Sequence, residues 1–339
     1  MSGRGPSRGG SSRGGSSRGG PSRGGPSRGG SSRGGSSSAG STRRAPARGV
    51  PKRATVASKQ PRSRGAGRTG PVRRESGAAD DGRRSKRDEG LGGKQIEGRQ
   101  PVRELLIAGR RKVHEVWISS ELEGDDGVDD IVELARAGRV PVQYVARRKL
   151  EAEARTDAPQ GVLAHAAELP GVEFESLLNR RTGVPFYVAI DGVTDPGNLG
   201  AIVRSCDGAG VEAVILPRHR AVHVTPTVAK SSAGAIEHVP LSLVGGLPTA
   251  LARLKEAKVW VVGLDDAADR SLFDLGDLAA DAICLVLGAE GAGLSRLTRQ
   301  RCDLVVSIPM LGRLSSLNVS AAAALATYEI SRHRRTPSK

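Results

Sequence analysis

Two apolar runs near the C-terminal end of the chain stop abruptly at small or polar residues. Residues 285–287 give way to glycines at 288, 291 and 293 around a single carboxylate, Glu290. Residues 304–308 end at Pro309, and a polar turn then leads into an alanine-rich stretch at 319–331 that is expected to be helical. Each run is expected to be a strand whose end opens into a small-residue loop, where backbone can approach a ligand closely.

The same alternation of apolar runs and polar turns divides the preceding part of the chain. At 94–167 it predicts helices at 101–108 and 129–137 and strands at 113–118, 140–145 and 161–166. Strands that alternate with helices predict a mainly parallel sheet covered by helices. Another buried strand is expected at 186–190, followed by a turn at 195–197 and a helix that Asn198 can cap, with Arg204 about two turns inside it.

Before residue 91 this pattern disappears. Five-residue units, SSRGG or PSRGG, repeat over residues 7–35, and glycine, serine and proline at this density predict disorder. Residues 1–90 hold 22 lysines and arginines against 5 acidic residues, whereas residues 91–339 hold 30 against 31. A flexible cationic arm of this kind is typical of RNA-binding segments; a soluble linker with incidental charge is the alternative.

Several classes of protein are disfavoured by the composition. The three cysteines lie far apart and the six histidines lack ligand spacing, so no disulfide framework and no metal site are expected. The chain start lacks the apolar core of a signal peptide, and no apolar run approaches the roughly 18 residues of a membrane span. The glycines at 288–293 do not match the dinucleotide fingerprint. We therefore expect a cytoplasmic protein without a membrane segment.

Three motifs, in a fixed order, resemble those of the TrmH-like (SpoU) branch of the SPOUT superfamily. They are Asn198-x-Gly200-x-x-x-Arg204 preceded by Asp-Pro, GAEGAGLS at 288–295, and IPMLGRLSSLNVSAAAALATYE at 308–329. AKSSAGAIEHVP at 229–240 looks like the family's middle region. GRQPVRELL at 98–106 and QGVLA at 160–164 look like its N-terminal substrate-binding domain. The segments LTRQRCD and SSLNVS are similar to those of the rRNA guanosine 2′-O-methyltransferase group.

This resemblance implies an α/β fold in four parts. They are a disordered basic tail at 1–90, a small ribosomal-protein-like α/β domain that binds RNA at 91–168, a linker at 169–183, and a catalytic domain at 184–339. The catalytic domain is implied to have a mostly parallel sheet and a trefoil knot. A homodimer is also implied, in which the helix at 319–331 meets its mate and Arg204 acts across subunits. Alternatively, that helix only covers its own sheet.

The implied activity is transfer of a methyl group from S-adenosylmethionine to a ribose 2′-hydroxyl in structured RNA, with a guanosine of 23S rRNA as the leading substrate. A tRNA is the runner-up substrate, and an rRNA position linked to drug resistance is a third. A non-catalytic RNA-binding or ribosome-assembly factor is the alternative from another class. That alternative predicts loss of the motif residues Asn198, Arg204, Glu290 and Asn318, and all four are present.

The motifs also imply roles for single residues. Gly288, Ile308 and Leu317 are the implied cofactor contacts, and a place in the core is the alternative for Ile308 and Leu317. Arg204 is the implied catalytic residue, and because guanidinium stays protonated we expect it to hold a phosphate and stabilise the developing alkoxide. Asn198, Ser316 and Asn318 are the candidates that position the ribose or the cofactor. Glu290 is the candidate that orients Arg204 across the site.

Overall fold

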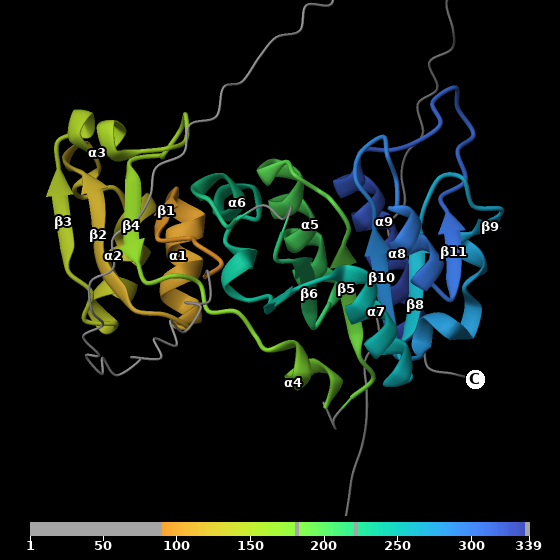
Figure 1. Ribbon diagram of the computed structural model, residues 1–339. Helices are drawn as coiled ribbons and strands as arrows, with labels where there is room; N and C mark the ends of the chain where they lie inside the picture. The colour runs from red at the N-terminus through yellow and green to blue at the C-terminus, as the bar shows by residue number, and fades with distance from the viewer. Residues whose placement is uncertain (1–89, 180–182, 220–222, 336–339) are drawn as a thin grey trace, which may run out of the picture. The chain divides into compact units, whose positions relative to one another are not determined.

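The computed structural model describes residues 90–179, 183–219 and 223–335, which form two α/β sheets with their helices (Figure 1). The predicted disordered tail at 1–90 lies outside the described residues, except for Gly90.

The first sheet belongs to the small domain. Its elements are β1 (Gln95–Glu97), α1 (Arg99–Ala108), β2 (Val113–Ser119), η1 (Ser120–Leu122), α2 (Asp126–Ala137), β3 (Val142–Val145), α3 (Arg147–Glu153) and β4 (Val162–Ala166). The strand order is β1-β4-β2-β3. Apolar side chains of α1 and α2 cover one face of this sheet, and α3 packs on the other face over Leu163 and Trp117.

The prediction of a mainly parallel sheet is wrong for this small domain. Only β2 and β3 pair in parallel, while β4 lies between β1 and β2 and runs antiparallel to both. The chain passes β2 after leaving β3 and enters β4 at the end of the sheet where β3 stops, so β4 runs in the direction opposite to β2 and β3.

Several boundaries in the small domain also differ from the prediction. Helix α1 starts at Arg99, and α2 starts at Asp126, three residues early, because Asp125 caps it by accepting a hydrogen bond from the Gly127 amide at 2.7 Å. Strand β3 starts at Val142 instead of residue 140. The short elements β1 and α3 were not predicted, since three to seven residues show too little periodicity. The expected linker at 169–183 contains a short helix, α4 (Phe174–Leu178).

The second sheet has seven strands in the order β7-β6-β5-β10-β8-β11-β9, and its neighbours pair in parallel. A mostly parallel catalytic sheet is therefore confirmed. Its elements are β5 (Phe186–Ile190), α5 (Pro196–Ala209), β6 (Ala213–Pro217), α6 (Pro226–Ser231), η2 (Ala235–Glu237), β7 (Leu241–Val244), α7 (Leu247–Glu256), β8 (Trp260–Leu264), β9 (Arg270–Ser271), η3 (Leu272–Asp274), η4 (Gly276–Ala280), β10 (Ile283–Leu287), α8 (Arg296–Arg301), β11 (Leu304–Ser307) and α9 (Val319–Arg335).

Alternate residues of the central strands face opposite layers. In β10, Ile283, Leu285 and Leu287 pack toward the layer of α5 and α9, whereas Cys284 and Val286 pack toward α7. Figure 1 shows α5 and α9 on the sheet within this domain. Because every side chain of β10 is buried, the strand reads as a continuous apolar run, as is typical of a parallel sheet covered on both faces.

Close helix packing explains two glycines of α5. A Cβ at Gly200 would lie 2.6 Å from the Val228 carbonyl oxygen in α6, so this motif glycine allows the two helices to touch. A Cβ at Gly208 would lie 2.5 Å from the Tyr328 hydroxyl in α9. Asp195 caps α5, accepting a hydrogen bond from the Asn198 amide at 2.6 Å, so the interpretation of Asn198 as the cap is wrong.

Candidate functional site

The carboxyl ends of three neighbouring strands meet at one edge of the catalytic sheet. Strands β10, β8 and β11 are adjacent and parallel. The loops that follow them begin at Gly288, at Asp265 and at Ile308. In open parallel sheets this edge is where ligands bind, because the loops there can diverge around a crevice.

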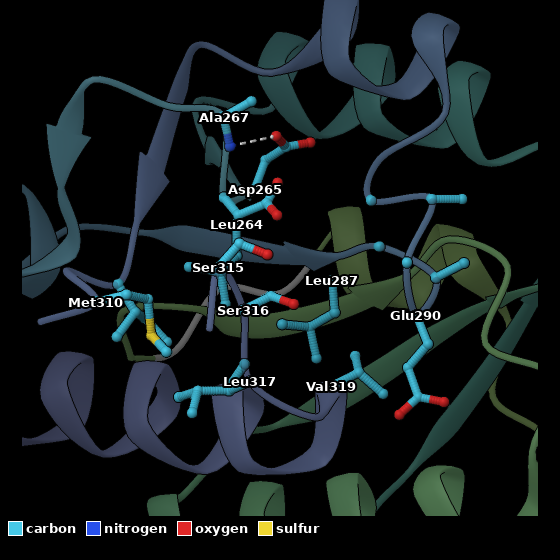
Figure 2. Close-up of a pocket in the computed structure, with 18 residues that line it drawn as sticks. Leu264, Asp265, Ala267, Leu287, Glu290, Met310, Ser315, Ser316, Leu317 and Val319 are labelled. Carbon is cyan, nitrogen blue, oxygen red and sulfur yellow. Dashed lines mark hydrogen bonds between the residues drawn. The ribbon is translucent and has the colours of Figure 1, made fainter. Parts of the chain in front are cut away.

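A cavity of about 280 Å³ lies between these loops (Figure 2). Five of the predicted site residues line it: Gly288, Glu290, Ile308, Ser316 and Leu317. The structure adds residues that the motifs did not single out, namely Leu264, Asp265, Asp266, Leu287 and Met310. The signal for Leu264 and the two aspartates is the apolar run of β8 that ends at them, a third strand end of the kind already recognised at β10 and β11. Leu287 ends the apolar run of β10, and Met310 lies within the third motif.

Gly288 is required where the backbone of this loop folds back on itself. Ala289 and Gly293 exchange two backbone hydrogen bonds of 3.0 Å each. A Cβ at Gly288 would lie 2.5 Å from the Gly293 carbonyl oxygen and 2.6 Å from the Leu294 amide nitrogen. Only glycine therefore allows this compact loop, which presents main-chain polar groups to the cavity.

Asp265 joins the loop after β8 to the loop after β10. Its carboxylate accepts hydrogen bonds from the amides of Ala267, at 3.1 Å, and Leu294, at 3.3 Å, and it pairs with Arg299 Nη1 at 2.7 Å. Burial alone would raise the pKa of Asp265, but the hydrogen bonds from Arg299 and the two amides outweigh burial and hold that pKa below its usual range. The side chain is only 8% exposed, so this charged clamp fixes one wall of the cavity.

We expect Asp265→Asn to destabilise the domain by about 1–3 kcal/mol at pH 7, because a buried charge-assisted network loses its charge. A carboxyl whose pKa is lowered on folding contributes stability above its unfolded pKa, which is about 3.9, and loses it as pH falls through the folded pKa. Urea unfolding should therefore show a gap between wild type and variant that closes below about pH 4. Asp269→Asn, at an exposed position of the same loop, is the control; a constant gap would contradict the assignment.

Three predicted residues form a hydrogen-bonded group at the rim of the cavity. Asn318 Nδ2 donates to Glu290 Oε1 at 2.6 Å and to Asn198 Oδ1 at 3.1 Å. Asn318 Oδ1 accepts from the Ser320 amide at 2.9 Å, which anchors the first turn of α9. Residues from all three sequence motifs are thus brought together, although 120 positions separate Asn318 from Asn198.

Arg204 lies apart from this group. It is exposed on α5 and, with Asp207, lines a second cavity whose other walls come from α1 and from the segment after α6. Within the described ranges, no hydrogen bond or ion pair joins Arg204 to Glu290. The contact between Glu290 and Arg204 that the sequence predicts is therefore not made within the described part of this chain.

The described residues contain no group of three or more potential metal ligands. The three cysteines are free, and burial raises the pKa of Cys302 to about 12, so this thiol is a poor nucleophile. Among the described helices, none is both long and apolar enough to cross a bilayer.

The fold and the cavity define a ligand-binding parallel α/β domain preceded by a second, smaller α/β domain. Residues 185–328 match the model of the SpoU rRNA Methylase family, and residues 95–171 match that for RNA 2′-O ribose methyltransferase substrate binding. The chain belongs to the SpoU rRNA methylase family. It is accordingly an RNA 2′-O-methyltransferase that depends on S-adenosylmethionine.

Two curated relatives and one solved structure illustrate the similarity. The chain is 42% identical to the 23S rRNA (guanosine-2′-O-)-methyltransferase RlmB of Pseudomonas aeruginosa, over 71% of this chain and 97% of the relative. It is 38% identical to RlmB of Shewanella oneidensis, over 71% and 98%. The SpoU methyltransferase AviRb from Streptomyces viridochromogenes, solved with AdoMet, superimposes with a TM-score of 0.61 and 29% identity, over 71% of this chain and 89% of AviRb.

Proposed function

We propose that this enzyme methylates the ribose 2′-hydroxyl of a guanosine in 23S rRNA, in the cytoplasm. The observation that carries the proposal is the cavity at the ends of β8, β10 and β11, whose lining and rim come from the three motifs. The similarity to the two RlmB proteins supports the choice of guanosine and 23S rRNA.

The cavity fits S-adenosylmethionine in its chemistry. The loop at Gly288 offers main-chain donors and acceptors to the edge of an adenine, and Leu264, Ile308 and Leu317 supply apolar walls for its faces. When bound, the cofactor supplies an electrophilic methyl group on a positively charged sulfur. The residues of this chain hold and orient the reactants and exclude water around them.

In this proposal Arg204 contacts the RNA. A 2′-hydroxyl is a weak nucleophile until its proton is shared or removed, and negative charge develops on its oxygen during transfer. The guanidinium of Arg204 holds the adjacent phosphate and stabilises that charge. The Asn198–Asn318–Glu290 group fixes the rim against which the ribose lies, and Ser316 offers a hydroxyl to the same space. The proton passes to water or to a phosphate oxygen.

We propose further that the enzyme is a homodimer. Apolar side chains between residues 311 and 328 face solvent in the single chain, including Leu311 at 100%, Leu314 at 76% and Tyr328 at 52% exposure. Such a concentration of exposed apolar groups is typical of an interface. A partner covering these residues would lie next to the cofactor cavity, where the partner's own Arg204 completes the site.

We also propose that the catalytic domain contains the trefoil knot that the motifs imply. The position of β10, which lies between β5 and β8 although it follows both in the chain, supports this proposal.

The direct test is to map 2′-O-methyl groups in rRNA and tRNA from cells with and without this protein, and to repeat the reaction with purified components. Loss of one guanosine methylation in 23S rRNA is the expected result. Loss of a tRNA methylation instead would overturn the substrate assignment. Calorimetry with S-adenosylmethionine distinguishes an enzyme from a non-catalytic RNA-binding factor, which would show no cofactor affinity.

Deletion of residues 1–90 should weaken RNA binding without changing the methylated nucleotide. The tail carries 22 of the chain's 52 lysines and arginines, and flexible cationic contacts with phosphates carry little sequence information. Titration over a range of salt concentrations should give a shallower salt dependence for the truncated protein. A changed methylation position would contradict this division of labour, in which the domain at 91–168 selects the RNA.

A further inference from the structure

A buried ion pair joins the small domain to the catalytic domain. Arg111, after α1, and Glu237, in η2, have side chains that are 2% and 1% exposed. Arg111 Nε donates to Glu237 Oε2 at 3.0 Å, and Nη2 donates to Oε1. Arg110 Nη1 donates to the Glu237 carbonyl oxygen at 3.0 Å. Glu237 therefore receives two consecutive arginines of the small domain, one at its carboxylate and one at its main chain.

Arg111 also holds the places where the chain enters and leaves the small domain. Its Nη1 donates to the carbonyl oxygens of Gly93, at 2.5 Å, and Ala167, at 2.7 Å. Gly93 lies just before β1, and Ala167 lies just after β4. One guanidinium thus connects the entering segment, the leaving segment and the catalytic domain.

The two connecting segments also pair with the catalytic domain through main-chain hydrogen bonds. Gly93 N donates to the Val224 carbonyl oxygen at 2.8 Å, and Val172 N donates to that of Leu241 at 2.8 Å. The Arg111–Glu237 pair adds a side-chain anchor that is almost fully buried. Its charges are costly to leave buried and unpaired, so the pair favours the docked arrangement.

The docked arrangement places α1 beside Arg204. Glu104 in α1 hydrogen-bonds His238 at 2.8 Å, and Gly234 allows this approach, since a Cβ there would lie 2.5 Å from the Glu104 Cβ. The cavity that Arg204 lines has Gln100 and Glu104 of α1 on its opposite side. The angle of the small domain therefore sets the space in front of Arg204.

We propose that Arg111 and Glu237 are positioning residues, which lock the small domain so that RNA bound there reaches Arg204 in one register. This inference rests on the proposed function for its catalytic consequence and on the geometry alone for the docking. Neither side chain lines the cofactor cavity or the cavity of Arg204. Their effect on methylation would thus pass through the orientation of the domain.

The test uses Arg111→Gln in the full chain, with two measurements. Hydrogen exchange at the amides of Gly93, Val172 and Val224 should become at least about tenfold faster, because the contact between the two domains, here called the seam, opens locally. The value of kcat/KM for the RNA substrate should fall about 100-fold, since a misplacement of about 1 Å has an effect of that size. The dissociation constant for S-adenosylmethionine should not change. A general loss of structure would instead weaken cofactor binding, so this measurement separates the two explanations.

Two further variants complete the experiment. Glu237→Gln keeps the size of the side chain and one acceptor, so it should show the same changes to a smaller degree. This variant replaces Arg111→Gln in the test if Arg111→Gln does not fold. Arg332→Gln removes another bidentate arginine–glutamate pair, with Glu329, but at the surface and within the single helix α9, and should match wild type. An unchanged seam, or a loosened seam with unchanged kcat/KM, would overturn the proposal. If the wild type did not methylate RNA, the proposed function would be overturned. Faster exchange at the seam in Arg111→Gln would still support the docking role in that case.

Discussion

Arg204→Ala should lower the rate of RNA methylation about 100- to 1,000-fold while leaving the affinity for S-adenosylmethionine nearly unchanged. The rate should fall because the guanidinium stabilises charge that develops only as the methyl group is transferred. The affinity should persist because Arg204 does not line the cofactor cavity of its own chain. Single-turnover methylation and calorimetry measure the two quantities separately.

Arg204→Lys is the matched control for charge. Lysine keeps the positive charge but lacks the planar fork that binds two phosphate oxygens at once, so we expect an activity between those of alanine and wild type. Normal turnover of Arg204→Ala would remove the catalytic role. A parallel loss of cofactor affinity would instead mean that the side chain supports the cavity of its own chain.

The sequence predicted the sheet edge that carries the cavity better than it predicted the small domain, for a physical reason. Fully buried parallel strands such as β10 are continuous apolar runs, and their ends are marked by glycine or acidic residues, so Gly288 and Ile308 could be placed at one sheet edge. The direction of β4 depends on the path that the chain takes after β3, and no local pattern in residues 146–161 specifies that path. The parallel sheet predicted there was therefore wrong.

Contacts between distant residues were the other limit. Arg111 and Glu237 are 126 positions apart, and each looks like an ordinary surface charge in its local sequence. Asp265 follows a recognisable strand, yet its role depends on Leu294 and Arg299 from another loop. Asn198 and Asn318 were placed at the site by the motifs, and the structure adds the hydrogen bond between them.

Gly288→Ala should weaken S-adenosylmethionine binding by about 5- to 150-fold, which corresponds to about 1–3 kcal/mol of overpacking. The added methyl group would meet the main chain of Gly293 and Leu294, which cannot rotate away as a side chain can. The loop must therefore open, and its polar groups leave the positions that face the cavity. Gly245→Ala, between β7 and α7, is the control, because the same methyl group meets nothing within 4 Å there. Equal cofactor affinity in the two variants would contradict the role of Gly288.

Mixing the two defective proteins tests whether Arg204 acts across subunits. A mixed dimer of Arg204→Ala and Gly288→Ala chains contains one site with an intact cavity from the first chain and an intact Arg204 from the second. Random exchange makes half of the dimers mixed, with one working site of two, so about a quarter of wild-type activity should return. If Arg204 served its own chain, neither chain would hold both parts. The mixture would then show only the residual activity of the two variants, at a cofactor concentration that saturates wild type but not Gly288→Ala. Restored activity would thus identify the dimer and the cross-subunit site in one measurement.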